Sequence, residues 1–446
     1  MSKDLPSQKR GHKTQILKVA GSDLGHFKEN DRQEKLGTWE VPSEPSESMD
    51  IIREAANLLR TKDIPVAFPT ETVYGLGAAA TRSAAVKGIY SAKGRPSDNP
   101  LIIHISDLEM LRDILIPAGE VNGIGSGTEN EDRIPKIYKP LIERFWPGPL
   151  TILMPNPKPS KLAAEVTAGL QTFGVRLPAS SLSRSLIKLT GAPLAGPSAN
   201  ASSKPSPTTA AHVLEDLDGR IELIIDGGSC HVGVESTVVD GLCDPPVVLR
   251  PGGVSMEELR SCPGWENVEK AYKDKSEAGT AAPRAPGMKY KHYSPKAKVV
   301  LYEAAFPGIE DGVQACDFEL QGTTDNTIGV IRTRTWWMGG GLPCGQFAEQ
   351  EKVNADAGLN GQAVVELGVR EAELRDSPDG KSVGKLLDIS IGRDTRSIAQ
   401  GLFSALRELD RRGANIIFVE GTVDDEDIGA AVMNRLRKAA SQIRSV

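Results

Sequence analysis

The sequence predicts a mixed α/β protein with two domains of unequal size. Short apolar segments typical of strands alternate with segments of helical periodicity from about Ser46 to Gly253, and the alternation resumes near residue 297. Between them, residues 263–295 are rich in Lys, Glu, Ala, Gly and Pro, which is typical of a linker. A chain of 446 residues is long enough for two hydrophobic cores.

Helices are expected where apolar residues recur at helical spacing, and strands where a short apolar run is bounded by turn residues. The clearest helical segments are 49–60, 84–94, 107–115 and 395–413. The clearest strands are 65–68, 99–105, 297–303, 327–333, 363–368 and 415–421. Strands that alternate with helices in the second domain favour a small, mostly parallel sheet.

These patterns divide the chain into four parts. Residues 1–45 are expected to be a poorly ordered extension, 46–262 the large domain, 263–296 the linker and 297–446 the smaller domain. Residues 118–136, rich in Gly, Asn and Glu, are expected to be a surface insertion because nothing in them could bury a face.

Composition excludes several classes of protein. The formal net charge of −6 argues against nucleic-acid binding through bulk counterion release, although a local basic cleft stays open. No apolar run approaches the roughly 20 residues that cross a bilayer. Five scattered cysteines without CxxC spacing form neither a disulfide framework nor a zinc site, which indicates a reducing compartment. The first residues lack a secretory h-region, and a weak organelle-targeting extension stays open.

Polar and basic residues cluster at the ends of several predicted strands. FPTETVYGLG (68–77) is interpreted as a strand, a turn and a helix whose first N–H groups could face an anion. The alternative is an ordinary connection that uses Gly75 and Gly77 for positive φ. In KGRPSDNPL (93–101), Lys93 and Arg95 on an extended segment could hold a polyphosphate together, or could be a solvated helix end.

Further along the chain, Arg176 lies in an otherwise apolar strand and therefore needs an anionic partner, either an internal carboxylate or a ligand. His104, inside LIIHI, is by itself more often a hydrogen-bonded core residue than a ligand. Residues 196–208 form a Ser-rich loop before a helix that Thr208 is expected to cap. Together with Ser236 and Arg250 at other strand ends, these residues indicate one anion-binding cleft.

Five motifs in this order resemble the threonylcarbamoyl-AMP synthase family: FPTETVYGLG, KGRPSDNPL, GPSAN followed by SPT, GVESTVVD and LRPGG. The likeness covers about Ile52 to Met256, and APGMKYKHYSP (285–295) resembles the linker of the long, two-domain members. Ser203 stands where a Gly is common, which leaves the path of that loop open. The resemblance implies a twisted mixed-sheet nucleotide-binding domain and a smaller Rossmann-like domain.

The same resemblance implies a reaction. L-Threonine, bicarbonate or CO2, and ATP would give L-threonylcarbamoyl-adenylate and pyrophosphate, the first step in modifying tRNAs that read codons beginning with A. A carbamate of threonine would attack the α-phosphate, so the protein has to position reactants and neutralise charge and needs no nucleophilic side chain.

By resemblance, site residues are carried over position by position. The expected ATP contacts are Arg95, Asn99, Thr172, Ser198, Asn200, Ser206 and Arg250. The expected threonine contacts are Thr72, His104, Arg176 and Ser236. Lys93 and Arg95 are expected to be catalytic through their charge at the phosphates, and Tyr293 is expected to be part of a lid.

Cofactor and partners follow from the resemblance. Mg²⁺ is expected to arrive with ATP and to be held mainly by phosphate oxygens and water. The product would pass to a separate tRNA threonylcarbamoyl transferase, without a stable nucleic-acid complex or membrane contact. The expected location is cytoplasmic, with a mitochondrial pool left open.

Two other functions remain open at this point. One is a non-catalytic RNA-binding protein that uses the same basic cleft, against which stand the net charge and the lack of aromatic residues among the cationic motifs. The other is an enzyme that forms a carbamoyl-adenylate from a different amine.

Overall fold

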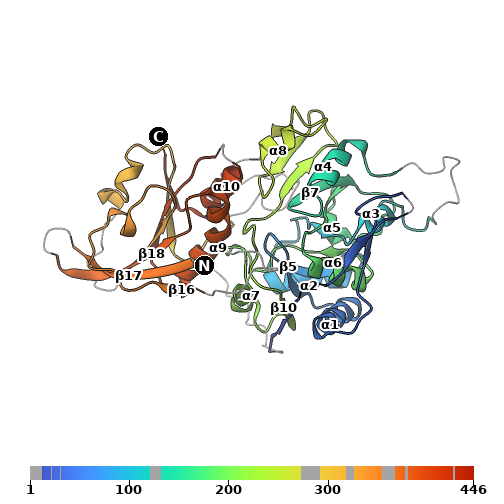
Figure 1. Ribbon diagram of the computed structural model, residues 1–446, viewed down its shortest axis with the longest axis horizontal. Coiled ribbons are helices and arrows are strands. Elements are labelled where there is room, and N and C mark those ends of the chain that lie inside the picture. Colours follow the sequence, from blue (N-terminus) through green and yellow to red (C-terminus); the bar gives the residue numbers. More distant parts are fainter. Residues whose placement is uncertain are drawn as a thin grey trace.

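The computed structural model describes residues 13–21, 23–30, 32–120, 132–272, 292–317, 326–353, 367–376, 380–424 and 427–445. Two α/β lobes lie side by side, and the first and larger lobe is coloured blue to yellow in Figure 1. The predicted two-domain α/β architecture is confirmed. Most of the expected linker (263–296), most of the expected insertion (118–136) and most of the expected strand 363–368 lie outside the described residues.

In the described part of the first domain, a mixed sheet of 11 strands forms the centre. Its strands, in spatial order, are β1 (Gln15–Lys18), β10 (Leu223–Asp226), β4 (Val66–Pro69), β5 (Tyr74–Ala79), β9 (Leu194–Ala195), β6 (Ile103–His104), β8 (Thr172–Arg176), β7 (Leu150–Pro155), β11 (Thr237–Asp240), β12 (Val247–Arg250) and β13 (Glu269–Lys270). β6 runs parallel to β8, whereas β7 runs antiparallel to it. Since β13 belongs to this sheet, the first domain extends past residue 262.

Register in this sheet brings distant segments together. His104 of β6 pairs with Arg176 of β8, and Gly75 of β5 forms a bridge with Ser198, which follows β9. Paired residues on parallel strands point to the same face, so His104 and Arg176 project side by side. The predicted meeting of strand-end motifs therefore follows from strand pairing.

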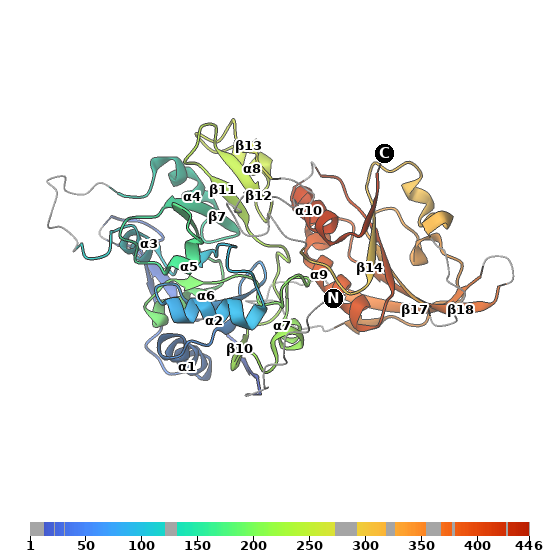
Figure 2. The same cartoon turned by 180° about the vertical axis from the view of Figure 1, so that it is seen from behind.

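Helices cover this sheet on both faces (Figures 1 and 2). They are α1 (Glu47–Thr61), α2 (Ser83–Lys93), α3 (Leu108–Ile114), α4 (Lys139–Phe145), α5 (Ala164–Thr167), α6 (Ser181–Thr190), α7 (Ala210–Leu217) and α8 (Met256–Arg260), with the 3₁₀ turn η1 (Lys136–Tyr138). α1 begins at Ser46, whose side chain accepts from the Met49 N–H, and it buries one apolar stripe that includes Ile52 and Leu59. α2 is followed by its C-cap Gly94, whose left-handed φ of 62° a glycine adopts without strain.

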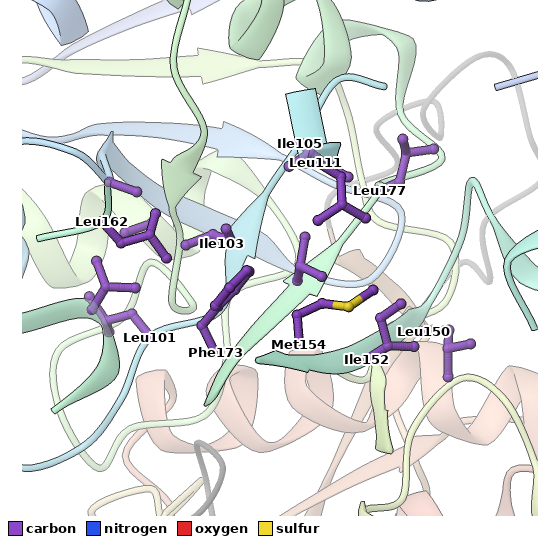
Figure 3. Close-up of a cluster of buried hydrophobic side chains, with 14 of the residues drawn as sticks. Leu101, Ile103, Ile105, Leu111, Leu150, Ile152, Met154, Leu162, Phe173 and Leu177 are labelled. Carbon is purple, nitrogen blue, oxygen red and sulfur yellow. The ribbon is translucent and has the colours of Figure 1, made fainter. Parts of the chain in front are cut away.

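The core of the first domain lies between the strands at its centre and the helices over them. Figure 3 shows Ile103, Phe173 and Met154, which come from β6, β8 and β7, in one cluster of buried apolar side chains. This packing holds β6 and β8 rigidly, and these two strands carry His104 and Arg176.

The second domain contains seven strands in its described part. Their order is β16 (Glu351–Val353), β17 (Leu367–Arg375), β18 (Ser382–Ser390), β15 (Asn326–Arg332), β19 (Ile416–Glu420), β14 (Lys298–Tyr302) and β20 (Gln442–Arg444). From β18 to β20 all neighbours are parallel, which confirms the predicted mostly parallel sheet. Three 3₁₀ turns, η2 (Ile309–Asp311), η3 (Ala315–Asp317) and η4 (Met338–Gly341), lie in its connections.

Two helices of the second domain, α9 (Thr395–Arg411) and α10 (Gly429–Ala439), lie between its sheet and the first domain (Figures 1 and 2). Arg407 of α9 forms an ion pair with Asp216 of α7 at 2.7 Å, and both side chains are buried. Arg435 of α10 forms an ion pair with Glu235, which precedes β11. The two domains are therefore joined by buried charge pairs.

The expectation that residues 1–45 are poorly ordered is wrong for much of the described part of this segment. β1 pairs in parallel with β10, and β2 (His26–Lys28) forms a hairpin with β3 (Thr38–Glu40). Trp39 of β3 is buried, and its Nε1 donates to Ser185 Oγ at 2.8 Å. These strands are only three or four residues long, so hydrophobic periodicity could not reveal them.

Two further expectations about local structure are wrong. The segment 68–77 is a strand pair, because β5 runs antiparallel to β4 and no helix follows the turn. Gly75 and Gly77 serve there by lacking a side chain: a Cβ on Gly77 would lie 2.7 Å from the Phe68 ring. The cap of α7 is Thr209 and not Thr208, whose hydroxyl lies 2.8 Å from Ser404 Oγ of α9.

All five cysteines are free, and Cys230 and Cys262 are buried. Over the described ranges, the structure contains no helix with the length and apolar character needed to cross a membrane.

We predict that Trp39→Ala lowers the free energy of unfolding by about 3–5 kcal/mol, the usual cost of removing a buried tryptophan side chain. Trp39 is 2% exposed, and its ring also lies 4.1 Å from the guanidinium carbon of Arg184. Trp337→Ala is the matched control: Trp337 is 81% exposed, so its loss should change stability by less than about 0.5 kcal/mol. Urea unfolding followed by circular dichroism measures both, and equal effects would mean that the N-terminal hairpin does not stabilise the domain.

Candidate active site

A cavity of about 410 Å³ lies where the strand-end loops of the first domain meet the beginning of the second. It is lined by 12 of the predicted site residues: Thr72, Lys93, Arg95, Asn99, His104, Arg176, Ser198, Asn200, Ser206, Ser236, Arg250 and Tyr293. Thr172, at the start of β8, does not line it. The predicted cleft is therefore one cavity. Its volume is in the range of small-molecule sites.

Arg176 is held at one end of this cavity by a buried carboxylate. Its Nη2 donates to Glu71 Oε1 at 2.5 Å, its Nη1 donates to Thr72 Oγ1 at 2.8 Å, and its Nε donates to the Gly148 carbonyl at 3.2 Å. Of the two partners that the sequence left open, the internal carboxylate is present. Since a guanidinium has five N–H donors, Nη1 and Nη2 each keep one proton that these contacts do not use.

His104 stands beside Arg176 and is 3% exposed. Burial, and then the positive charge of Arg176, lower the pKa of His104 to about 3, so its ring is neutral near pH 7. Its Nδ1 is buried and has no hydrogen-bond partner among the described residues. This atom faces Gly196, where an added Cβ would lie 2.9 Å from it.

Lys93 is the last residue of α2, and the predicted extended geometry around it is wrong because Gly94 turns the chain with left-handed φ. Its Nζ donates to the carbonyls of Ser198 and, at 2.6 Å, Asn200. Burial, and then the charge of Arg95, lower the pKa of Lys93 well below 10.5. The ammonium thus fixes the loop after β9 from within the cavity wall.

The loop after β9 is closed by its own side chains. Ser198 Oγ donates to Asn200 Oδ1 at 2.5 Å, and Asn200 Nδ2 donates to the carbonyls of Ala201 and Lys204. Ser203 adopts a φ of 73°, which explains why glycine suits this position. Across the cavity, Asn99 Oδ1 is buried without a hydrogen-bond partner among the described residues.

Arg250, at the end of β12, donates hydrogen bonds to Ser236, the residue before β11. Its Nε and Nη2 donate to the Ser236 carbonyl at 3.1 and 2.9 Å, and Nη2 also donates to Ser236 Oγ at 3.1 Å. Burial lowers the pKa of Arg250 to about 10, which still leaves it charged. Ser236 Oγ also lies 2.7 Å from Thr151 Oγ1.

Tyr293, in the segment that leads into the second domain, lines part of the cavity. It is buried, and its ring stacks on Phe403 of α9 with centroids 5.2 Å apart. The next N–H, of Ser294, donates to the Ser203 carbonyl at 2.8 Å. The segment that carries Tyr293 is thereby attached to the loop after β9, and His292 also lines the cavity.

Sequence reasoning assigned no role to Glu71 and Glu235, although both lie inside motifs that it quoted. Each pairs with an arginine more than 100 positions away, Arg176 and Arg435 respectively. Each is a carboxylate in a motif that is otherwise apolar and rich in hydroxyl groups. A carboxylate that is buried requires a cation as partner, so its position in the motif could have indicated the pairing.

The fold and the cavity define a class of protein: an α/β protein with a cationic small-molecule site at strand-end loops. Comparison with known proteins makes this specific. A family model described as telomere recombination matches residues 59–252, and one described as threonylcarbamoyl-AMP synthase, C-terminal domain, matches residues 254–441.

Curated relatives cover most of the chain. A threonylcarbamoyl-AMP synthase of Schizosaccharomyces pombe is 43% identical over 426 residues, which are 93% of this chain and 94% of the relative. That of Bacillus subtilis is 40% identical over 408 residues, 91% of this chain and 98% of the relative. The crystal structure of Pyrococcus abyssi Sua5 complexed with L-threonine is 34% identical, with a TM-score of 0.67 over 97% of this chain and 100% of that one.

This chain belongs to the threonylcarbamoyl-AMP synthase family. It is accordingly an enzyme of the nucleotidyltransferase type. The alternative of a non-catalytic RNA-binding protein is not favoured by these relatives.

We predict that His104 stays neutral from about pH 8 down to about pH 5 in the folded protein. Its folded pKa is about 3, whereas the unfolded chain protonates it near 6.5. The free energy of unfolding therefore decreases as the pH falls below about 6.5, and it continues to decrease down to about pH 3. NMR titration of the ring resonance, assigned with His104→Gln, measures this, and a folded-state midpoint near 6.5 would contradict the burial argument.

Proposed function

We propose that this cavity makes L-threonylcarbamoyl-adenylate from L-threonine, bicarbonate or CO2, and ATP, and releases pyrophosphate. One observation carries the proposal: all but one of the residues assigned by resemblance to ATP and threonine line a single cavity. The family to which the chain belongs and the threonine complex of the Pyrococcus relative support it.

Threonine is proposed to bind at the end formed by Thr72, His104, Arg176 and Ser236. Glu71 holds the Arg176 guanidinium from one side, which leaves one N–H on each terminal nitrogen for a carboxylate. Because the His104 ring is neutral, its Nδ1 can accept a hydrogen bond from a donor group of the ligand without adding a charge to the site. These features suit a small, hydroxyl-bearing amino acid.

ATP is proposed to bind along Arg95, Asn99, Ser198, Asn200, Ser206 and Arg250, with Lys93 and Arg95 supplying positive charge near the phosphates. Lys93 acts there from behind the Ser198–Asn200 loop, because its protons are directed at carbonyls of that loop. Thr172 retains a proposed ATP role only if a neighbouring segment moves, since it lies outside the cavity wall.

The reaction requires the protein to position the reactants more than to form a covalent bond with them. The threonine amine and CO2 form a carbamate, one of whose oxygens attacks the α-phosphorus of ATP in line while the bond to pyrophosphate breaks. The carbamate is labile in water, so a cavity that closes over it protects it, and buried cations stabilise charge on the phosphoryl oxygens. Tyr293 is proposed to belong to a lid that closes this space.

Mg²⁺ is proposed to enter with ATP. Among the described residues no group of three or more His, Cys, Asp or Glu side chains could hold a metal, and Glu71 and Glu235 are each paired with an arginine. These residues fit a metal held by phosphate oxygens and water. The product is proposed to pass to a separate tRNA threonylcarbamoyl transferase in the cytoplasm.

We predict that pyrophosphate release from ATP requires threonine and bicarbonate together, because the attacking group is their carbamate. A coupled pyrophosphate assay with each reactant omitted in turn tests this, and serine in place of threonine tests the choice of amine. Equal release with threonine or bicarbonate absent would refute the proposed reaction.

We predict that Arg176→Lys weakens threonine binding by roughly 1.5–3 kcal/mol, the scale of a charge-assisted hydrogen bond, because lysine keeps the charge but loses the fork. ATP affinity without threonine should stay within a few-fold, since Arg176 lies on β8 beside His104, whereas Arg95 follows α2. Calorimetric titration of each ligand measures this. Loss of ATP binding with retained threonine binding would reverse the proposed division, and retention of both would leave Arg176 as a partner of Glu71 only.

A further inference from the structure

A negatively charged residue stands in a cavity that is proposed to receive a triphosphate. Glu235 lines the wall with Ser206, Ser236 and Arg250, and it is the sole carboxylate among the described lining residues. Its Oε1 accepts from Ser206 Oγ at 2.5 Å. Ser206 and Arg250 are proposed nucleotide contacts, so this carboxylate lies directly behind the proposed nucleotide subsite.

The second domain supplies the cation that faces this carboxylate. Arg435 of α10 is 0% exposed, and its Nε donates to Glu235 Oε2 at 3.0 Å. Its Nη1 donates to the carbonyl of Pro251, the residue after Arg250. Burial raises the pKa of Glu235, but the charges of Arg435 and Arg250 outweigh this effect, so the pKa is lowered overall and the carboxylate is ionised.

These contacts give Arg435 two effects on the nucleotide wall. It offsets a negative charge that would otherwise repel the phosphates at short range in a water-poor site. It also fixes Glu235, which precedes Ser236, and Pro251, which follows Arg250. We propose that Arg435 is a positioning residue for ATP: by neutralising and orienting Glu235, the second domain completes the nucleotide subsite of the first. This inference rests on the proposed function.

A second charge pair between the domains offers a comparison. Arg407 of α9 donates to Asp216 Oδ2 at 2.7 Å and to the Pro205 carbonyl, and neither Arg407 nor Asp216 lines the cavity. Loss of Arg407 weakens domain docking without exposing a carboxylate in the cavity wall. Arg407→Gln therefore removes an interdomain charge pair that lies outside the cavity wall and serves as the comparison for Arg435→Gln.

The experiment measures ATP and threonine affinities separately, by calorimetry on the full-length chain, after circular dichroism has confirmed folding. Arg435→Gln should weaken ATP binding at least about tenfold, because Glu235 then loses its ion-pair partner beside the phosphates, and should leave threonine binding within about threefold. Arg435→Lys, which keeps the charge, should bind ATP more tightly than Arg435→Gln. The double variant Glu235→Gln with Arg435→Gln should recover ATP affinity to within about threefold of the unsubstituted chain, because no unpaired charge remains.

A merely structural role predicts a different pattern. If Arg435 acts only by docking the domains, the double variant stays as weak as Arg435→Gln, and Arg407→Gln weakens ATP binding equally; either result overturns the inference. Unchanged ATP affinity in Arg435→Gln also overturns it. If Arg435→Gln alone does not fold, a folded double variant that has lost ATP affinity is sufficient to overturn it. Absence of ATP binding by the unsubstituted chain contradicts the proposed function itself, whereas normal ATP binding with unresponsive Arg435 variants overturns this inference alone.

Discussion

Buried positive charge around one cavity is the constraint on which the local structure depends. Lys93, Arg176, Arg250 and Arg435 are all buried, and a buried cation is costly unless it is paired or hydrogen-bonded. The partners that stabilise these cations differ. Arg176 and Arg435 pair with a carboxylate, and Lys93 donates to backbone carbonyls. Arg250 donates to the Ser236 carbonyl and is also attracted by the charge of Glu235. Because carbonyls are used as partners, the loops that carry them are fixed by the same contacts that keep the cations in place.

The division of labour between carboxylates and carbonyls also bears on ligand binding. A cation paired with a full negative charge has little net field, whereas one that faces only carbonyl dipoles keeps most of its positive potential. Lys93, Arg95 and Arg250 place basic groups on the proposed nucleotide side, where Glu235 is the sole carboxylate among the described lining residues. Arg176, tied to Glu71, contributes mainly directed N–H donors. The cavity thus combines a region that attracts polyanions with a region that recognises shape and hydrogen bonding.

Much of this arrangement could be predicted from sequence, and the failures have physical reasons. Helices α1 and α9 were predictable because each presents a long apolar stripe, and the strand-end position of Arg176 and Arg250 followed from short apolar runs. Nine of the 12 predicted lining residues lie in the five ordered motifs, whereas His104, Arg176 and Tyr293 lie outside them. β1 and β3 were missed because strands this short are stabilised by tertiary contacts, such as the burial of Trp39, and not by local pattern. The pairing of Glu71 and Glu235 with distant arginines depends on the tertiary fold, which residue spacing does not contain.

The contact between His104 and Gly196 has a consequence for how such a cavity can change. A Cβ at position 196 would lie 2.9 Å from the imidazole Nδ1 and 3.7 Å from the Phe68 ring, so the ring cannot keep its place beside any larger residue. Gly77, on the neighbouring strand, packs against the same Phe68 ring. Positions 68, 77, 104 and 196 therefore form a single steric unit that must be altered together. A change that moves the His104 ring to admit a bulkier amino acid would therefore also have to make room at Gly196 and at the Phe68 ring behind it.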